Sequence, residues 1–147
     1  MVQNVTPITD DPVAQLHQAM KSLAMGKNDS QRRKVYELMM TADLRIALQP
    51  GVEPEEALDD PSKWLITEYL QGMPVFVVFT CADAVEVFSE GAPSTLNLRG
   101  FKLFPKLVSV KPASLLINPG FRFGGELYLN ELRMLANAAP RYKAMKF

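Results

Sequence analysis

The chain has 147 residues, of which 48% are hydrophobic and 22% charged, which is the size and composition of one ordinary globular domain rather than a disordered or fibrous chain. Its single cysteine, Cys81, excludes an intramolecular disulfide and a zinc site built from several thiolates, so we expect a reducing compartment. The formal net charge of zero disfavours nucleic-acid binding.

No membrane or export segment is predicted. The first eleven residues lack the basic and apolar regions of a signal peptide. The longest strongly apolar run, residues 73–79, is far shorter than the roughly 20 residues that a spanning helix needs. We therefore expect a cytoplasmic protein that does not bind membranes.

The neutral total hides a partition of charge along the chain. Residues 51–90 carry nine acidic side chains against Lys63, whereas residues 91–147 carry nine basic side chains against Glu126 and Glu131. The two segments attract each other, either within one molecule on a solvated surface or between molecules. The second alternative predicts a homo-oligomer or an acidic partner.

Two amphipathic helices are predicted at the start. The first begins at Pro12, with Asp10 or Asp11 as its cap, and ends at Gly26. The second begins at Asp29 or Ser30. Apolar residues recur at helical spacing on one face of each: Val13, Leu16, Met20 and Leu23 in the first, and Val35, Leu38, Met39 and Ala42 in the second. The basic triplet 32–34 is interpreted as solvated, with an anion contact as the alternative.

The middle of the chain predicts three strands. Alternation of apolar and polar residues indicates a strand over 43–49, ended by Pro50 and Gly51. Residues 52–62, with five carboxylates and two prolines, are expected to form a mobile loop. Trp64–Leu70 and Val75–Phe79 then form a hairpin with Pro74 in its turn. The second of these strands is apolar on both sides, which predicts a central strand covered on both faces.

The strand at 75–79 leads directly into a predicted helix that ends near Ser89. Thr80 and Asp83 have the spacing of a capping box, with Asp in place of the usual Glu. Further on, residues 99–108 are expected to form a short or broken helix with buried phenylalanines, because Pro105 interrupts regular helix.

The last part of the chain predicts two strands and a helix. Leu115–Ile117 form a strand that stops at Asn118, Pro119 and Gly120. Glu126–Leu129 form another, and Asn130 caps a final helix that ends at Pro140. The chain is thus expected to be one α/β (α+β) domain, with a mixed sheet of about 4–5 strands and helices packed around it.

Three segments in this order resemble the N-terminal domain of the SseB (enhanced serine sensitivity) family: KVYELMMTADLRIALQPG at 34–51, MPVFVVFTCADAVEVF at 73–88 and SLLINPGFRFGGELYLNELRML at 114–135. The family's P-V-F-T junction is matched by Pro74, Phe79 and Thr80, and its I-N-P-G turn by residues 117–120. The resemblance covers residues 13–138 and implies that fold, with flexible ends at 1–10 and 140–147. The family's name reports a phenotype and implies no reaction.

Catalytic and metal chemistry are not predicted. Cys81 lies at the expected start of a helix, where the helix dipole favours a thiolate, but cysteine catalysis needs a base. The one histidine, His17, falls in a distant helix on its expected solvated face. One histidine and one cysteine far apart do not make a zinc site, and the acidic residues 53–60 lack the spacing of an EF-hand. We expect no enzyme, no metal and no cofactor.

Binding candidates gather around two strand ends: Thr80, Cys81, Asn118, Pro119, Gly120 and Arg122. Arg122 lies between two phenylalanines in a glycine-flanked loop after a strand, a place where α/β sheets bind ligands. The favoured hypothesis is a non-enzymatic protein-interaction or regulatory module. The alternatives are a small-anion or amino-acid binding domain that uses the loop Asn118–Gly125, and a thiol-dependent enzyme that uses Cys81.

Overall fold

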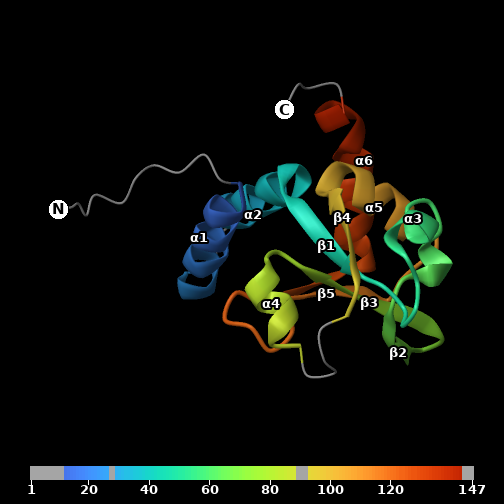
Figure 1. Ribbon diagram of the computed structural model, residues 1–147. Coiled ribbons are helices and arrows are strands. Elements are labelled where there is room, and N and C mark those ends of the chain that lie inside the picture. The colour runs from blue at the N-terminus through green and yellow to red at the C-terminus, as the bar shows by residue number, and fades with distance from the viewer. Residues whose placement is uncertain (1–11, 27–28, 89–92, 144–147) are drawn as a thin grey trace.

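The computed structural model describes residues 12–26, 29–88 and 93–143, which form one α+β domain (Figure 1). The helices are α1 (Pro12–Met25), α2 (Asp29–Thr41), α3 (Pro54–Ala57), α4 (Ala82–Glu86), α5 (Gly100–Val108) and α6 (Leu129–Lys143), with a 3-10 turn η1 (Pro61–Lys63). The strands are β1 (Asp43–Ala47), β2 (Ile66–Leu70), β3 (Met73–Phe79), β4 (Thr95–Arg99), β5 (Ser114–Ile117) and β6 (Gly125–Tyr128). The predicted fold class is confirmed, with slightly more strands than expected.

The strands form one mixed sheet in the order β4-β1-β3-β5-β6, and β2 pairs with β3 alongside. Four of the pairings are antiparallel, whereas β3 and β5 run parallel, with Val75 opposite Ser114 and Val78 opposite Ile117. A parallel pair needs a long crossover, which here contains α4, β4 and α5. The carboxyl ends of β3 and β5 therefore meet at one edge of the sheet.

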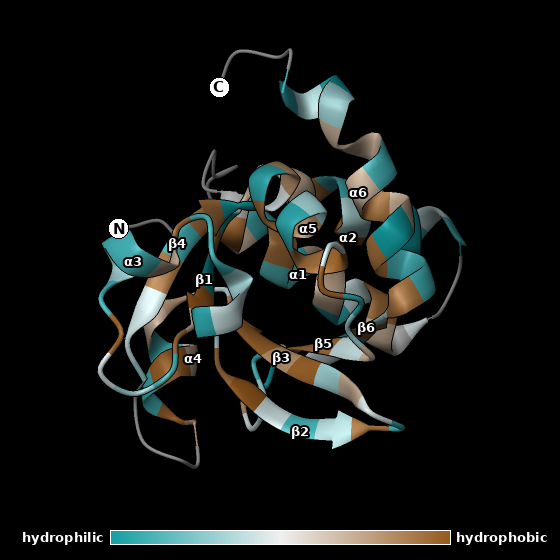
Figure 2. Cartoon of the chain, turned by 90° about the vertical axis from the view of Figure 1, so that its right-hand side faces the viewer, coloured by the Kyte–Doolittle hydropathy of each residue, from teal (hydrophilic) through white to brown (hydrophobic). Residues whose placement is uncertain are grey.

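The central strand β3 is buried on both faces, as its continuous apolar sequence predicted. Phe76 and Val78 pack into the larger core, to which α1, α2, α5 and α6 contribute, while Val77 and Phe79 pack into a smaller core with α4. Figure 2 shows the hydrophobic run of β3 at the middle of the sheet, beside the more polar β2. Alternate side chains of one strand thus hold the helices of both faces.

The predicted hairpin is confirmed, but the position of Pro74 in its turn is wrong. The turn consists of Gln71 and Gly72, both with positive φ, and Pro74 lies inside β3 opposite Tyr69. Leu70 and Met73 flank the two-residue turn and form a hydrogen-bonded pair. Tyr69 and Pro74 are the next pair, and in an antiparallel hairpin this pair exchanges no main-chain hydrogen bonds. Pairing of β3 with β5 begins only at Val75, so the missing N–H removes no bond from the sheet.

The predicted loop over 52–62 contains α3 and η1, so its interpretation as unstructured is wrong. Its carboxylates cap these turns: Glu56 accepts the N–H of Glu53 at 3.0 Å, and Asp60 accepts the N–H of Ser62 at 3.1 Å. The bond from Glu53 lowers the pKa of the Glu56 carboxyl, and the hydroxyl of Ser62, followed by its backbone N–H, lowers the pKa of the Asp60 carboxyl. The buried indole of Trp64 donates to the carbonyl of Ala57 at 3.0 Å and fixes the segment from inside.

The two N-terminal helices are confirmed: α1 ends at Met25, immediately before Gly26, and the apolar stripe of α2 is buried. The predicted cap, Asp10 or Asp11, lies outside the described residues. Within those residues, no helix has the length and apolarity needed to cross a membrane.

Three expectations about the C-terminal helices are wrong. α5 is short and buries Phe101 and Phe104 as predicted, but it continues through Pro105, because its buried face outweighs the lost hydrogen bond. α6 begins at Leu129, so Asn130 lies inside its first turn, where the N–H of Tyr128 donates to Glu131 at 3.1 Å. It also continues through the exposed Pro140 to Lys143. The expected flexible ends otherwise fall on residues 1–11 and 144–147, outside the described residues.

Candidate functional site

The parallel pairing of β3 and β5 brings Thr80 and Asn118 together, since each residue directly follows one of these strands. The backbone N–H of Asn118 extends the pairing by donating to Val78 at 2.9 Å. Asn118 then turns the chain with φ at 50°, a left-handed conformation that asparagine tolerates better than most residues. Two candidates that lie 38 positions apart in the sequence thus become neighbours.

The side chain of Asn118 connects both strand ends and the following loop. Its Oδ1 accepts the N–H of Thr80 at 2.9 Å, and its Nδ2 donates to Thr80 Oγ1 and to the carbonyl of Phe123, each at 2.8 Å. Asn118 is 0% exposed and Thr80 is 1% exposed. A buried amide that makes three hydrogen bonds fixes the geometry of this edge of the sheet.

His17 belongs to this site, so the prediction that it lies on a distant, solvated face is wrong. The helix α1 crosses the strand ends, and His17 Nε2 lies 2.6 Å from Thr80 Oγ1. Asn118 donates to the same oxygen, so the hydroxyl of Thr80 joins His17 and Asn118, and the tautomer of His17 decides which of Nε2 and Oγ1 carries the proton between them. The contact spans 63 positions, and helical periodicity alone carries no signal for it.

The loop after β5 adds an aromatic platform. The ring of His17 stacks on Phe123, with centroids 4.5 Å apart and planes 14° from parallel. Phe121 meets Phe123 edge to face, and the guanidinium carbon of the exposed Arg122 lies 5.6 Å and 5.2 Å from the centroids of these two rings. The flanking rings that the sequence suggested for Arg122 are therefore in place.

The remaining candidates shape the backbone of this loop. Pro119 is half-buried, and Gly120 has φ at 82°. The turn closes through the N–H of Phe121, which donates to the carbonyl of Asn118 at 3.0 Å. We refer to His17, Thr80, Asn118, Phe121, Arg122 and Phe123 as the strand-end cluster.

Cys81 lies beside this cluster and packs, half-buried, against the smaller core. It is the cap residue of α4, so the predicted capping box that begins at Thr80 is wrong. Thr80 uses its hydroxyl toward His17 and Asn118 instead. Within the described residues, no group of three or more His, Cys, Asp or Glu side chains is arranged to hold a metal ion.

A comparison with family models identifies the family of this domain. The model of the SseB protein N-terminal domain matches residues 16–134, which include most of α1, the whole sheet and the start of α6. The chain belongs to the SseB N-terminal domain family. The resemblance carried by the segments at 34–51, 73–88 and 114–135 is thereby confirmed. A search of curated proteins finds no match.

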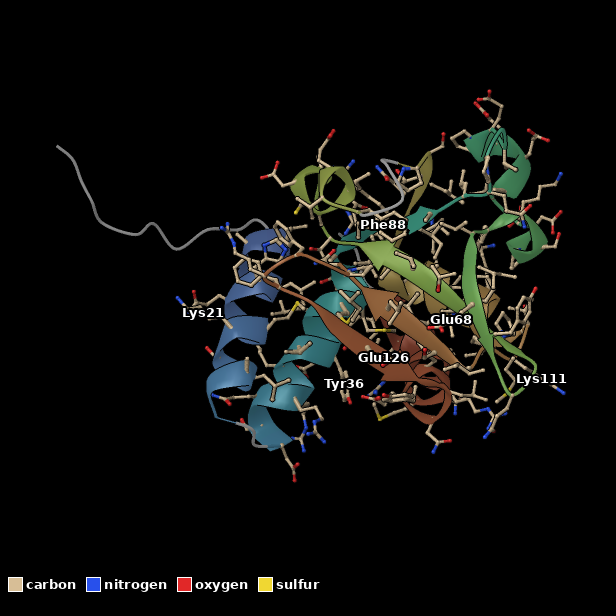
Figure 3. The ribbon with its side chains drawn as sticks, turned by 90° about the horizontal axis from the view of Figure 1, so that it is seen from below. Lys21, Tyr36, Glu68, Phe88, Lys111 and Glu126 are labelled. Atoms are coloured by element: carbon tan, nitrogen blue, oxygen red, sulfur yellow. The ribbon has the colours of Figure 1, made fainter. Side chains whose placement is uncertain are left out.

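A second feature of this SseB-family domain, which the sequence did not predict, is a groove between α1 and α2 on one side and β6 on the other. Its volume is about 540 Å³. We call it the β6 groove, and its lining consists of Met20, Leu23, Ala24, Arg32, Val35, Tyr36, Met39, Ile117, Gly124, Gly125, Glu126, Leu127 and Glu131. Tyr36 on α2 and Glu126 on β6 come from opposite sides of it (Figure 3).

Hydroxyl groups orient the two carboxylates of the β6 groove. Glu131 accepts from the hydroxyl of Tyr36, and Glu126 accepts from Ser114 Oγ at 2.6 Å and from the hydroxyl of Tyr128 at 3.0 Å. Partial burial, and then the bond to Glu131, raise the pKa of Tyr36 to about 12. The folded state therefore favours the protonated hydroxyl of Tyr36, and the effect extends into the alkaline range.

Among the described residues, one ion pair joins the acidic segment 51–90 to the basic segment 91–147. Lys106, from the basic segment, forms an ion pair with Asp59, from the acidic segment, at 2.5 Å. The other two ion pairs among these residues, Lys63–Glu56 and Arg99–Asp43, do not join the two segments. Exposed pairs of this kind add little stability, so most of the partitioned charge is presented to solvent.

Proposed function

We propose that this SseB-family domain is a non-enzymatic protein-interaction or regulatory module of the cytoplasm. The observation that carries the proposal is the exposure of large apolar side chains on strands at the border of the sheet. Tyr69 is 62% exposed on β2, with Leu70 beside it, and Tyr128 is 55% exposed on β6. Exposed aromatic side chains on a rigid element are typical anchors of protein interfaces.

The non-enzymatic part of the proposal is supported by how the strand-end cluster uses its polar atoms. Thr80 and Asn118 are buried and hydrogen-bonded to each other. Among the described residues, no buried side-chain nitrogen or oxygen lacks a hydrogen-bond partner. A hydroxyl enclosed in this way holds two strand ends in place and is shielded from a substrate.

The interaction role can be tested by photo-crosslinking in living cells. The photoreactive residue p-benzoylphenylalanine replaces Tyr69 or Tyr128, and, as a matched control, Tyr142 on α6, which is less exposed. We expect a defined adduct from at least one of the first two positions, identified by mass spectrometry as another protein or a second copy of this chain. Absence of adducts from both border positions would contradict the proposal.

The absence of thiol chemistry has its own test. The rate at which iodoacetamide alkylates Cys81 at pH 7 is compared with that of free cysteine. A rate no higher than that of free cysteine is expected for a half-buried residue that caps a short helix. A markedly faster reaction, abolished by changing His17→Gln, would favour the thiol-enzyme alternative.

A second candidate function is the binding of a small anion or an amino acid at the loop Asn118–Gly125. The exposed guanidinium of Arg122, supported by two phenylalanine rings, favours it. Thermal shift against inorganic phosphate and single amino acids tests it, because a ligand of the native state raises the melting temperature. The shift should be lost in Arg122→Gln and kept in Arg133→Gln, which changes an exposed arginine on α6.

A further inference from the structure

The free edge of the sheet at β6 opens into the β6 groove. Among the described strands, β6 pairs with β5 alone. The N–H of Tyr128 donates to Glu131 at 3.1 Å and so points away from β5. In an antiparallel pair, residues two apart direct their main-chain groups to the same side, so the N–H and carbonyl of Glu126 also point away from β5.

The two sides of β6 differ in chemistry. Leu127 lies opposite Leu115 and joins the larger core on the helix side. Glu126 lies opposite Leu116, which packs against the smaller core on the other side of the sheet. A strand laid along this edge would therefore turn alternate side chains toward apolar residues of α1 and α2, such as Leu23 and Val35, and toward the carboxylate of Glu126.

The charges of the β6 groove favour a basic occupant. Glu126 and Glu131 are held by hydroxyl donors, and neither forms an ion pair with a lysine or arginine of the described part of the chain. Arg32 is the cation of the lining, so the lining carries one net negative charge. The apolar walls and the volume of about 540 Å³ are those of a binding groove.

We propose that the β6 groove binds an extended segment of a partner protein, which adds to the sheet as a strand beside β6. The segment alternates apolar residues, which face α1 and α2, with basic residues, which face Glu126. Main-chain hydrogen bonds to Glu126 supply part of the affinity, and the two sets of side chains supply the specificity. This proposal rests on the interaction function proposed above and assigns it a surface and a partner chemistry.

The probe is a heptapeptide with acetylated and amidated ends, in which valine and lysine alternate. It is titrated into the ¹⁵N-labelled chain, and binding is followed by NMR. We expect chemical-shift changes at Glu126, Tyr128 and Val35, and slower hydrogen exchange of the Glu126 amide. A peptide of the same composition with its valines and lysines in separate blocks should bind much more weakly, because it lacks the alternation.

Two substitutions separate charge from backbone pairing. Glu126→Gln keeps the N–H and should weaken binding about twofold to fivefold, the effect of a partly exposed ion pair. Glu126→Pro removes the outward N–H without removing a bond to β5 and should abolish binding. The control Glu68→Gln, an exposed carboxylate on β2, should leave the affinity unchanged. Circular dichroism checks that each variant is folded.

Equal binding of both peptides, unchanged affinity of Glu126→Pro or shift changes confined to another surface would each overturn strand addition at β6. Equally tight binding of single valine and lysine amides would make the groove a small-molecule site and would overturn it too. If the peptide fails while crosslinks from Tyr69 persist, the interaction function stands and only this surface is wrong. If crosslinks are absent as well, the proposed function also fails.

Discussion

The strand-end cluster contains the loop that follows β5, and the β6 groove begins where this loop ends, yet the two sites use polar side chains in opposite ways. In the strand-end cluster, the buried Thr80 and Asn118 satisfy each other's donors and acceptors, together with the half-buried His17. At the β6 groove, the carboxyl groups of Glu126 and Glu131 accept hydrogen bonds from the hydroxyls of Ser114 and Tyr36 and form no ion pair among the described residues. Thr80 and Asn118, which were binding candidates in the sequence, therefore hold the fold together, whereas the β6 groove is lined by residues that the sequence did not single out.

The comparison of the two sites predicts the largest loss of stability for a substitution at Asn118. The change Asn118→Ala removes three buried hydrogen bonds and leaves the N–H of Thr80 without its acceptor, so we expect the free energy of unfolding to fall by about 3 to 5 kcal/mol. Urea denaturation measures it. The exposed Asn97→Ala is the control, with a change within about 0.5 kcal/mol. A loss below 1 kcal/mol at Asn118 would show that the cluster is not structural.

A smaller loss is expected at Thr80. The change Thr80→Val keeps the shape of the side chain but deprives His17 and Asn118 of their shared hydroxyl, at a cost of about 2 kcal/mol. Thr80→Ser keeps the hydroxyl and should cost clearly less in the same denaturation experiment. Equal losses in the two variants would mean that the methyl group, and not the hydroxyl, matters at this position.

Tyr36 should make the stability of the groove region depend on pH in the alkaline range. Its pKa is raised from 10.0 to about 12, so the folded state favours the protonated hydroxyl. The resulting stabilisation is fully present below pH 10 and is lost as the pH rises through 12. The difference in unfolding free energy between the parent chain and Tyr36→Phe, about 1 kcal/mol at pH 8, should therefore shrink between pH 10 and 12. A constant difference across this range would contradict the assignment.

The smallest effect on stability is expected for Glu126→Gln. Glutamine keeps an acceptor oxygen for Ser114 or Tyr128, so the free energy of unfolding should change by no more than about 0.5 kcal/mol. Thermal and urea denaturation measure the change. A loss as large as that of Thr80→Val would place Glu126 among the structural residues and remove the contrast between the two sites.

Much of the fold could be predicted because local patterns and packing agree. The apolar run of β3, the alternation in β1 and the stripe of α2 each describe a burial that the structure contains. The strand β4 was not predicted, because its five residues lie between a poorly patterned segment and a helix. It is defined by its pairing with β1, from Asp43 opposite Arg99 to Ala47 opposite Thr95.

The errors share a cause, which is that local rules ignore tertiary context. Pro74 was expected in a turn, Pro105 was expected to interrupt a helix and Pro140 to end one, yet each lies inside a strand or helix. Pro74 occupies a position where the sheet needs no N–H, and the buried face of α5 compensates for Pro105. The acidic residues 53–60 were interpreted as a solvated loop because the sequence alone does not show that the buried indole of Trp64 donates a hydrogen bond to the carbonyl of Ala57 within this segment.

For the candidate site, the sequence identified Thr80 and Asn118, which contact each other, but not His17, which contacts Thr80. Thr80 and Asn118 were candidates because each follows a predicted strand, and the parallel pairing that brings the two strand ends together is found only in the structure. His17 was missed because its contact depends on how α1 crosses the sheet, which no nearby residue encodes. The β6 groove could not be predicted for the same reason, because it is formed by two helices and an edge strand that are distant in the sequence.

The position of β3 has a consequence for how the domain opens. It is the one strand, among those described, that pairs with three others, and both of its faces are buried. Both edges of its backbone are paired and both faces are covered, so we expect its amides to exchange with deuterium mainly when the whole domain unfolds. The four-residue strand β6, bonded along one side only, can detach from β5 at far lower cost, so the border of the sheet can adapt while its centre stays intact.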